Sequence, residues 1–87
     1  MAAKKVALVT GAGTGVGRAA ALALMKEGYA VVLAGRRIEM LEAVAAEGAQ
    51  TPGESLTVSA DVGDPAAIKA MFAKIKDTYG RLDLLFN

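Results

Sequence analysis

The residues best suited to chemistry stand in one glycine-rich stretch, TGAGTGVG, at positions 10–17. An apolar run, Val6–Val9, precedes it and a run rich in alanine and leucine follows, so it predicts the turn between a strand and a helix. The first N–H groups of a helix lack partners within it, and the helix dipole favours an anion there. Glycines let the backbone turn sharply and let a pyrophosphate approach. The stretch therefore predicts a phosphate-binding turn; the alternative is a connecting loop without a ligand.

The spacing of the glycines distinguishes between known phosphate-binding patterns. G-x-G-x-x-G fails, because Val16 and Arg18 stand where the last small residue would be required. The P-loop pattern fails as well, since no Gly-Lys-Ser/Thr follows at the required distance. The pattern that fits is T-G-x-x-x-G-x-G. The residues that we expect to contact the ligand are Gly11, Gly13, Thr14, Gly15, Val16 and Gly17.

Composition excludes several classes of protein. The 87 residues are 54% hydrophobic, which excludes a disordered segment. Their net charge is +1, from ten basic and nine acidic residues spread along the chain, so no basic cluster is present and we expect no nucleic-acid partner. Cysteine and histidine are absent, and we expect no metal site. The apolar run near the start of the sequence is too short for a signal peptide. No stretch of about 18 consecutive apolar residues occurs, so no membrane-spanning segment is predicted. We therefore expect a cytoplasmic protein without a membrane partner.

The elements that must position the turn alternate between strand and helix. Buried strands are predicted from short apolar runs, and helices from apolar residues at helical spacing. Asp64 and Pro65 are typical of a helix start, and Gly80 of a helix end. The predicted elements are strands 6–10, 29–34, 56–60 and 82–86, and helices 16–27, about 37–47, and one from 65 that ends before Gly80.

The apolar positions of these helices predict how they pack. In the third helix a single apolar stripe is predicted, and it consists of Ile68, Met71, Phe72, Ile75 and Tyr79. Three methionines, Met25, Met40 and Met71, are predicted to fill the core.

Short right-handed crossovers make such a chain an α/β fold with a doubly wound parallel sheet. The predicted strand order is 3-2-1-4, with the switch point between the first and fourth strands. The fourth strand would then be an apolar edge without a neighbour, and one face of the sheet would carry two helices but the other only one. We therefore expect residues 1–87 to be the N-terminal part of a single Rossmann-type domain that is incomplete here.

Four motifs in register give the sequence a specific resemblance. TGAGTGVG is joined by Ala34-Gly35-Arg36-Arg37, by Asp61-Val62 and by LDLLFN at positions 82–87. Together they resemble the short-chain dehydrogenase/reductase family in its ordinary, non-extended form, and LDLLFN resembles the strand that leads into the family's N-N-A-G motif. The resemblance covers all 87 residues. It implies a nicotinamide dinucleotide cofactor, and we expect the N-terminal half of such a protein.

The residues after the second strand indicate which dinucleotide is bound. An NAD site usually has an acidic residue about there, which accepts hydrogen bonds from the ribose. Here Gly35 is followed by Arg36 and Arg37, and a guanidinium suits a 2′-phosphate. We therefore predict NADP as the cofactor, with NAD possible. The alternative is that both arginines are solvated residues at the start of the second helix.

The resemblance also implies roles near the adenosine. It implies that the Asp61 side chain and the Val62 backbone meet the adenine edge, and that Asn87 lies near the adenine-side ribose and braces the strand end. The alternative is that Asp61 is a turn residue before Gly63; the two interpretations are compatible, and we favour the adenine contact. Arg18 could face phosphate or lie on the helix surface, and we interpret Asp83 as a strand-end residue.

The resemblance implies hydride transfer between the cofactor and an alcohol or carbonyl substrate, with a tyrosine, a lysine four positions later and a nearby serine as the catalytic set. Tyr29 and Tyr79 are followed at that distance by Leu33 and Asp83, so no catalytic residue is assigned. We expect a small-molecule substrate to be bound by residues beyond Asn87, in a homo-oligomer, a dimer or a tetramer. The alternative is a non-catalytic dinucleotide-binding module, such as a redox sensor.

Overall fold

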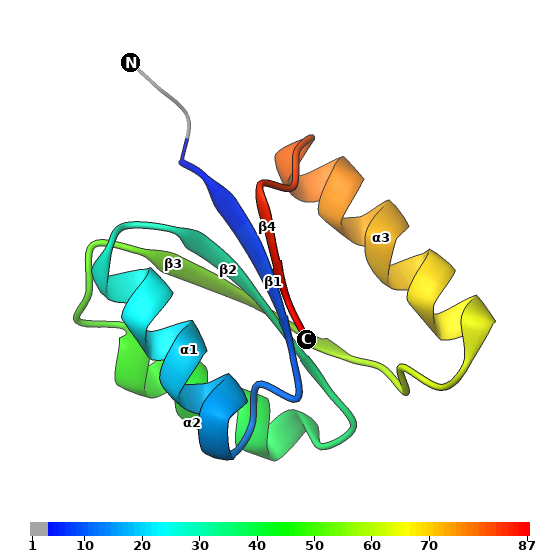
Figure 1. Cartoon of the computed structure of the whole chain (residues 1–87), viewed down its shortest axis with the longest axis horizontal. Helices are drawn as coiled ribbons and strands as arrows, with labels where there is room; N and C mark the ends of the chain where they lie inside the picture. Colours follow the sequence, from blue (N-terminus) through cyan, green and yellow to red (C-terminus); the bar gives the residue numbers. More distant parts are fainter. Residues whose placement is uncertain (1–3) are drawn as a thin grey trace.

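Strands and helices alternate along the chain (Figure 1). The structure is a computed structural model that describes residues 4–87. Residues 1–3 lie outside the described residues, although the predicted domain and the segment compared with a signal peptide both include them. The elements are β1 Val6–Thr10, α1 Gly15–Lys26, β2 Ala30–Gly35, α2 Ile38–Gly48, β3 Glu54–Ser59, α3 Pro65–Tyr79 and β4 Leu84–Phe86. All the predicted elements are present, with bounds that agree to within two residues.

The four strands form one parallel sheet in the order β3-β2-β1-β4, which confirms the predicted topology. In the register of the central pair, Val6 of β1 lies opposite Ala30 of β2. On its other side β1 pairs with β4, with Ala7 opposite Leu84. The strand order therefore reverses between β1 and β4, and open α/β sheets bind ligands beyond the carboxyl ends of their strands at such a point.

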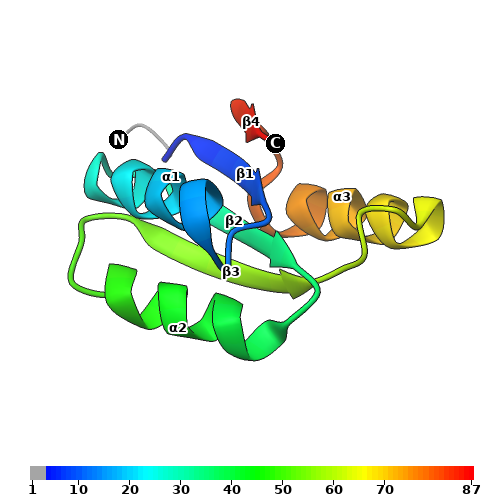
Figure 2. The same ribbon diagram turned by 60° about the horizontal axis from the view of Figure 1, so that its bottom comes forward.

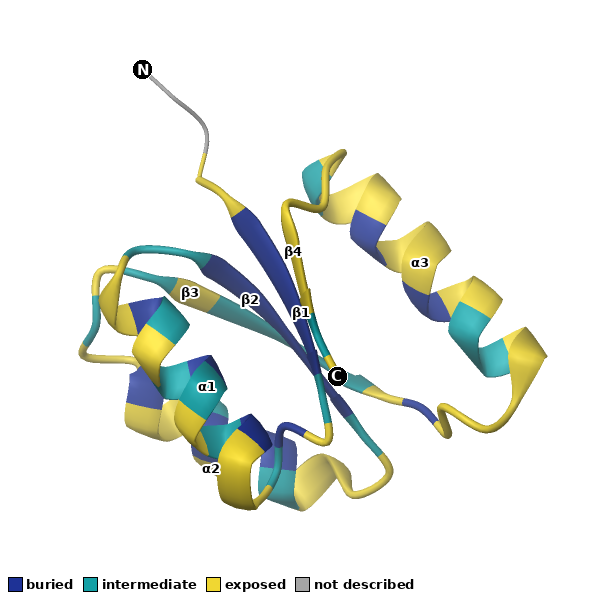
Figure 3. Ribbon diagram, viewed as in Figure 1, coloured by how far each residue is buried: buried dark blue, intermediate teal, exposed yellow. Residues whose placement is uncertain are grey.

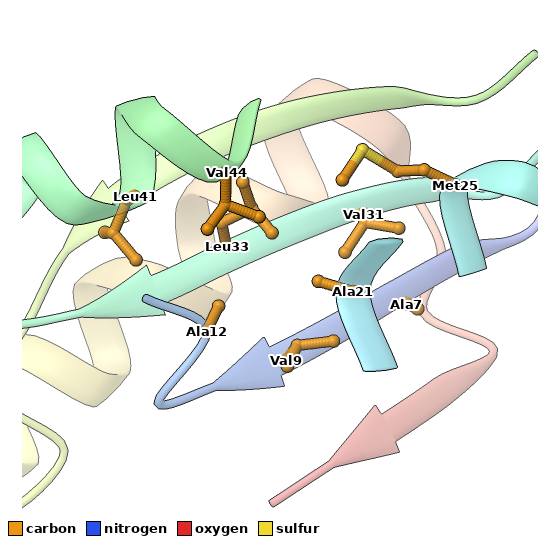
Figure 4. Packing of buried hydrophobic residues seen from close by; sticks show 9 residues of the cluster. All are labelled: Ala7, Val9, Ala12, Ala21, Met25, Val31, Leu33, Leu41 and Val44. Carbon is orange, nitrogen blue, oxygen red and sulfur yellow. The ribbon is translucent and has the colours of Figure 1, made fainter. Parts of the chain in front are cut away.

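Apolar cores cover both faces of the two central strands. On one face Val9, Val31 and Leu33 pack beneath α1 and α2 (Figure 4). On the other face Leu8 and Val32 pack against α3, which lies across the sheet from the first two helices (Figure 2). Burial on both faces explains why these strands appear in the sequence as continuous apolar runs. None of the three described helices has the length and apolarity that a membrane crossing requires.

The ends of α3 follow local rules that the sequence displays. The Asp64 carboxylate accepts a hydrogen bond from the Ala66 N–H at 3.0 Å, and Pro65 occupies the first turn, where its missing N–H is not needed. At the other end Gly80 adopts a left-handed conformation with φ of 71°, which glycine tolerates best. These signals confirm the predicted helix and fix where the chain turns back toward β4.

The strand β4 is an exposed edge and is shorter than predicted. The predicted strand began at Leu82, but pairing with β1 begins at Leu84. Just before it, the Asp83 carboxylate accepts the Val6 N–H at 2.8 Å, and the Asp83 N–H donates to the Val6 carbonyl at 2.8 Å. Leu84 and Leu85 remain 40% and 50% exposed (Figure 3).

One member of the predicted α3 stripe is exposed. Met71 and Ile75 are 3% and 2% exposed, but Phe72 is 41% exposed. Phe72 borders a groove between α3 and β4, across from Leu85, instead of packing under the helix. Phe72 therefore belongs to the apolar stripe of α3 but lies outside the core of the residues that the structure describes.

Candidate functional site

Glycines allow the turn between β1 and α1 to fold tightly. Gly11 and Gly15 have φ values of 62° and 57°, a region that other residues rarely adopt. Gly17 is buried against the turn, and a Cβ atom there would lie 2.2 Å from the Gly11 carbonyl oxygen. The T-G-x-x-x-G-x-G spacing thus places a positive φ or a close backbone contact at each of its glycines.

The turn leaves several donors unused at the start of α1. The first helical hydrogen bond runs from the Arg18 N–H to the Thr14 carbonyl at 3.2 Å. The N–H groups of residues 15–17 therefore have no acceptor in the part of the chain that the structure describes. The Thr14 hydroxyl makes no capping hydrogen bond, and Val16 is 74% exposed. An anion placed here would meet unpartnered donors and the positive end of the helix dipole.

A pocket of about 230 Å³ lies beside this turn, at the carboxyl ends of β1 and β2. Two helices begin at this end of the sheet, α1 after Thr14 and α2 after Arg37 (Figure 1). No acidic side chain lines the pocket in the described part of the chain. Its lining residues are Gly11, Gly13, Thr14, Gly35, Arg36, Arg37, Met40 and Leu41. The pocket combines two helix starts with two guanidinium groups, which favours a phosphorylated ligand.

Two glycines let α2 come close enough to form one wall of this pocket. A Cβ at Gly13 would lie 3.0 Å from the Met40 Cβ, and a Cβ at Gly35 would lie 3.2 Å from the Leu41 Cδ2. Met40, predicted to fill the core, is instead half-buried and lines the pocket. Its place in the first turn of the helix, just after Arg37, is the signal that could have identified it.

The end of β2 and the loop after β3 are joined by an ion pair. Arg36 Nη2 lies 3.3 Å from Asp61 Oδ1, and the Gly63 N–H donates to the same oxygen at 2.8 Å. The Gly63 hydrogen bond, followed by the charge of Arg36, lowers the pKa of Asp61 below its ordinary value. The turn interpretation of Asp61 is therefore confirmed. Its other carboxylate oxygen makes no hydrogen bond within the described residues, so it is available to a ligand.

Val62 and Asn87 lie at a second pocket, away from Arg36 and Arg37. This pocket has a volume of about 340 Å³ and is lined by Leu8, Thr10, Val62, Ile68, Met71, Phe72, Leu85 and Asn87. The Thr10 hydroxyl donates to Asn87 Oδ1 at 2.9 Å, which ties the end of β4 to the end of β1. The residues predicted for the adenosine end of the ligand are thus divided between two pockets, with Arg36 and Arg37 at the first and Val62 and Asn87 at the second.

Two charged residues outside the pockets have structural partners. Arg18 Nε donates to Glu47 Oε1 at 3.1 Å, so this side chain ties α1 to α2. That hydrogen bond and the charge of Glu47 raise the pKa of Arg18. The Asp83 carboxylate binds the start of β1 and also pairs with Arg81, which confirms its interpretation as a strand-end residue.

The two tyrosines pack against the cores and line none of the described pockets. Tyr29 lies against the core under α1 and α2, and Tyr79 against the core under α3, where burial raises its pKa. Within residues 4–87 no group of three or more potential metal ligands is present.

Comparison with known proteins agrees with this geometry. A family model described as short chain dehydrogenase matches residues 5–87. A 3beta-hydroxysteroid dehydrogenase from Mediterraneibacter gnavus is 43% identical over 84 residues, which cover 97% of this chain and 30% of that protein. The chain belongs to the short-chain dehydrogenase family.

Solved structures of the family share the fold. A metagenomic short-chain oxidoreductase in complex with NADP has a TM-score of 0.89 and 38% identity, covering 93% of this chain and 37% of that one. An alcohol dehydrogenase from the archaeon Thermococcus sibiricus, complexed with 5-hydroxy-NADP, has a TM-score of 0.89 and 33% identity, covering 95% and 36%. The chain therefore spans about a third of the length of the relatives it matches.

Proposed function

We propose that the chain is the NADP(H)-binding part of an oxidoreductase that transfers a hydride between this cofactor and an alcohol or carbonyl compound. The observation that carries the proposal is the pocket between the β1–α1 turn and the first turn of α2, which Arg36 and Arg37 also line. The unpartnered N–H groups of residues 15–17 beside it suit the pyrophosphate, and its cationic side chains suit a further phosphate. Solved relatives with NADP or 5-hydroxy-NADP support a nicotinamide dinucleotide.

Each part of the cofactor's adenosine half, from the adenine to the pyrophosphate, has a candidate partner in this chain. We assign the pyrophosphate to the turn, the 2′-phosphate to Arg36 and Arg37, and the adenine to Asp61 and Val62. Asn87 is assigned to the adenine-side ribose. The turn residues are Gly11, Gly13, Thr14, Gly15, Val16 and Gly17. When bound, the cofactor would give or accept the hydride, while these residues hold and orient its adenosine diphosphate half.

The preference for NADP(H) over NAD(H) follows from the end of β2. Gly35 provides no carboxylate to accept hydrogen bonds from the ribose hydroxyls or to repel a phosphate. Arg36 lines the pocket, and its side chain is 77% exposed, so its donors are open to a ligand. A guanidinium binds phosphate through charge-assisted hydrogen bonds that a hydroxyl cannot equal.

Titration of the whole protein with NADP⁺ and NAD⁺ tests this preference. A hydrogen bond to a charged group contributes about 1.5–3 kcal/mol, so Arg36→Ala should weaken NADP⁺ binding by about tenfold or more and change NAD⁺ binding by only a few-fold. Arg18→Ala is the matched control, because it removes a guanidinium paired with Glu47 outside the pocket. If Arg36→Ala weakened the binding of both dinucleotides equally, Arg36 would be a solvated residue without a role in cofactor preference.

The catalytic step is tested separately from binding. We place the substrate contacts and the catalytic residues outside these 87 residues. A serine followed by Tyr-x-x-x-Lys later in the whole protein, together with oxidation of NADPH in the presence of carbonyl compounds, would support the oxidoreductase. Binding of the dinucleotide without either would support the alternative of a non-catalytic, redox-sensing module.

A further inference from the structure

We propose that Asp61 is a specificity-determining residue, whose carboxylate competes with the 2′-phosphate of NADP(H) for the Arg36 guanidinium. By this competition Asp61 holds the preference for NADP(H) below the value that Arg36 alone would give. The inference rests on the proposed function. It adds a second role to a residue otherwise assigned to the adenine.

The position of the Asp61 carboxylate is fixed by the backbone of its own loop. Asp61 Oδ1 accepts the Gly63 N–H at 2.8 Å and lies 3.3 Å from Arg36 Nη2. The bond to Gly63 keeps the carboxylate in place whether or not Arg36 stays beside it. The low pKa of Asp61 means that this group carries its negative charge throughout the neutral range. A permanent anion therefore stands next to the donors that a phosphate would need.

The pair is open enough for a ligand to disrupt it. The side chains of Arg36 and Asp61 are 77% and 50% exposed, and exposed ion pairs contribute little to stability. A dianionic phosphate can therefore displace the carboxylate from Arg36. The displaced carboxylate still stands beside the site, where it repels the phosphate by like charge. NAD(H) has a hydroxyl in place of this phosphate and meets neither effect.

The substitution Asp61→Asn isolates the charge. An asparagine side chain keeps an oxygen that can accept the Gly63 N–H, so the turn is preserved. Any change in the contact with adenine affects both dinucleotides alike and cancels in the ratio of their affinities. Asp64→Asn is the matched control: Asp64 stands on the same loop, its carboxylate caps α3, and asparagine is an equally good N-cap residue.

The experiment measures dissociation constants of NADP⁺ and NAD⁺ for the whole protein and both variants. In Asp61→Asn the affinity ratio of NADP⁺ to NAD⁺ should rise about three- to tenfold at low salt, while Asp64→Asn stays within about twofold of the wild type. The gain should shrink as salt rises, because the Debye length is about 10 Å at 0.1 M. An unchanged or lower ratio in Asp61→Asn would overturn the inference.

The same substitution in an Arg36→Ala background separates competition for the guanidinium from general charge. Removal of Arg36 leaves nothing to compete for, so the gain from Asp61→Asn should be smaller than in the wild-type background. An equal gain in both backgrounds would overturn the competition. A wild-type protein that binds neither dinucleotide would instead refute the proposed function itself, so the two failures are distinguishable.

Discussion

At the scale of single residues, the absence of a side chain at Gly17 brings the turn and α1 into contact. The obstacle to any Cβ there is backbone, the carbonyl carbon and oxygen of Gly11, and backbone cannot move aside as the end of a flexible side chain can. The same contact holds Gly11 in its positive φ conformation and aims the first N–H groups of α1 outward. We therefore expect both stability and the proposed ligand binding to depend on this position.

We expect Gly17→Ala to destabilise the whole protein by about 2–3 kcal/mol or more, because overpacking of this kind forces the backbone apart. The affinity for both dinucleotides should fall together, since the displaced turn carries the N–H groups. The exposed Ala19 of the same helix provides the control, and Ala19→Ser should stay within about 0.5 kcal/mol of wild type. Urea denaturation would check both, and a wild-type midpoint for Gly17→Ala would contradict the contact.

Residue-scale features differed in how far the sequence could predict them. The turn was predictable because its spacing and conformations are local. The contact of Arg36 with Asp61 was not, because the residues stand 25 positions apart and meet only where the ends of β2 and β3 come together in the sheet. Arg18 is a similar case, since its partner Glu47 lies on another helix. The roles of these residues toward a cofactor remain predictions.

At the scale of elements, Asp83 couples the start of β4 to the start of β1. Its carboxylate is held first by the Arg81 side chain and then by the Val6 N–H, and together they lower its pKa below the ordinary value of about 3.8. A carboxylate with a lowered pKa in the folded state stabilises the fold above the unfolded pKa, and this stabilisation is lost as pH falls through the folded pKa.

We therefore expect Asp83→Asn to reduce the ratio of folded to unfolded protein by about two- to fivefold at neutral pH. The effect is small because the pair is exposed. Asparagine keeps an acceptor for Val6, so the difference reports the charge. Unfolding followed from pH 7 toward pH 2 should show the gap between wild type and variant closing below about pH 4. Asp77→Asn, on the exposed side of α3, should show no such gap. A gap that persists at the lowest pH would show that the charge of Asp83 is not its cause.

The elements also show where periodicity alone is insufficient. Spacing placed Phe72 on the apolar stripe of α3, but burial depends on which element covers that side of the helix, and there Phe72 borders a groove. The third strand was predicted to begin at residue 56, yet β3 begins at the polar residue Glu54, which lies opposite Ala30. An edge strand with exposed side chains tolerates such residues, so composition underestimates its length.

At the scale of the whole molecule, the pairs of neighbouring strands differ in how far apart their residues stand in the sequence. β1 and β2 meet through Val6 and Ala30, 24 positions apart, and β2 and β3 meet through Ala30 and Glu54 at the same separation. β1 and β4 meet through Ala7 and Leu84, 77 positions apart. The loop that the last pairing closes therefore contains two other strands and all three helices.

This difference bears on the order in which the sheet assembles. Closing the longer loop costs about 1 kcal/mol more entropy than closing either shorter one, and the β1–β4 ladder repays it with only three residue pairs. We expect the two ladders among β1, β2 and β3 to form first during refolding and β4 to join late. Pulse-labelled hydrogen exchange on the refolding protein would show protection of amides in β3 before those in β4, and simultaneous protection would contradict this order. The reversal of strand order that creates the candidate ligand-binding edge would thus also make it the last part of these four strands to form.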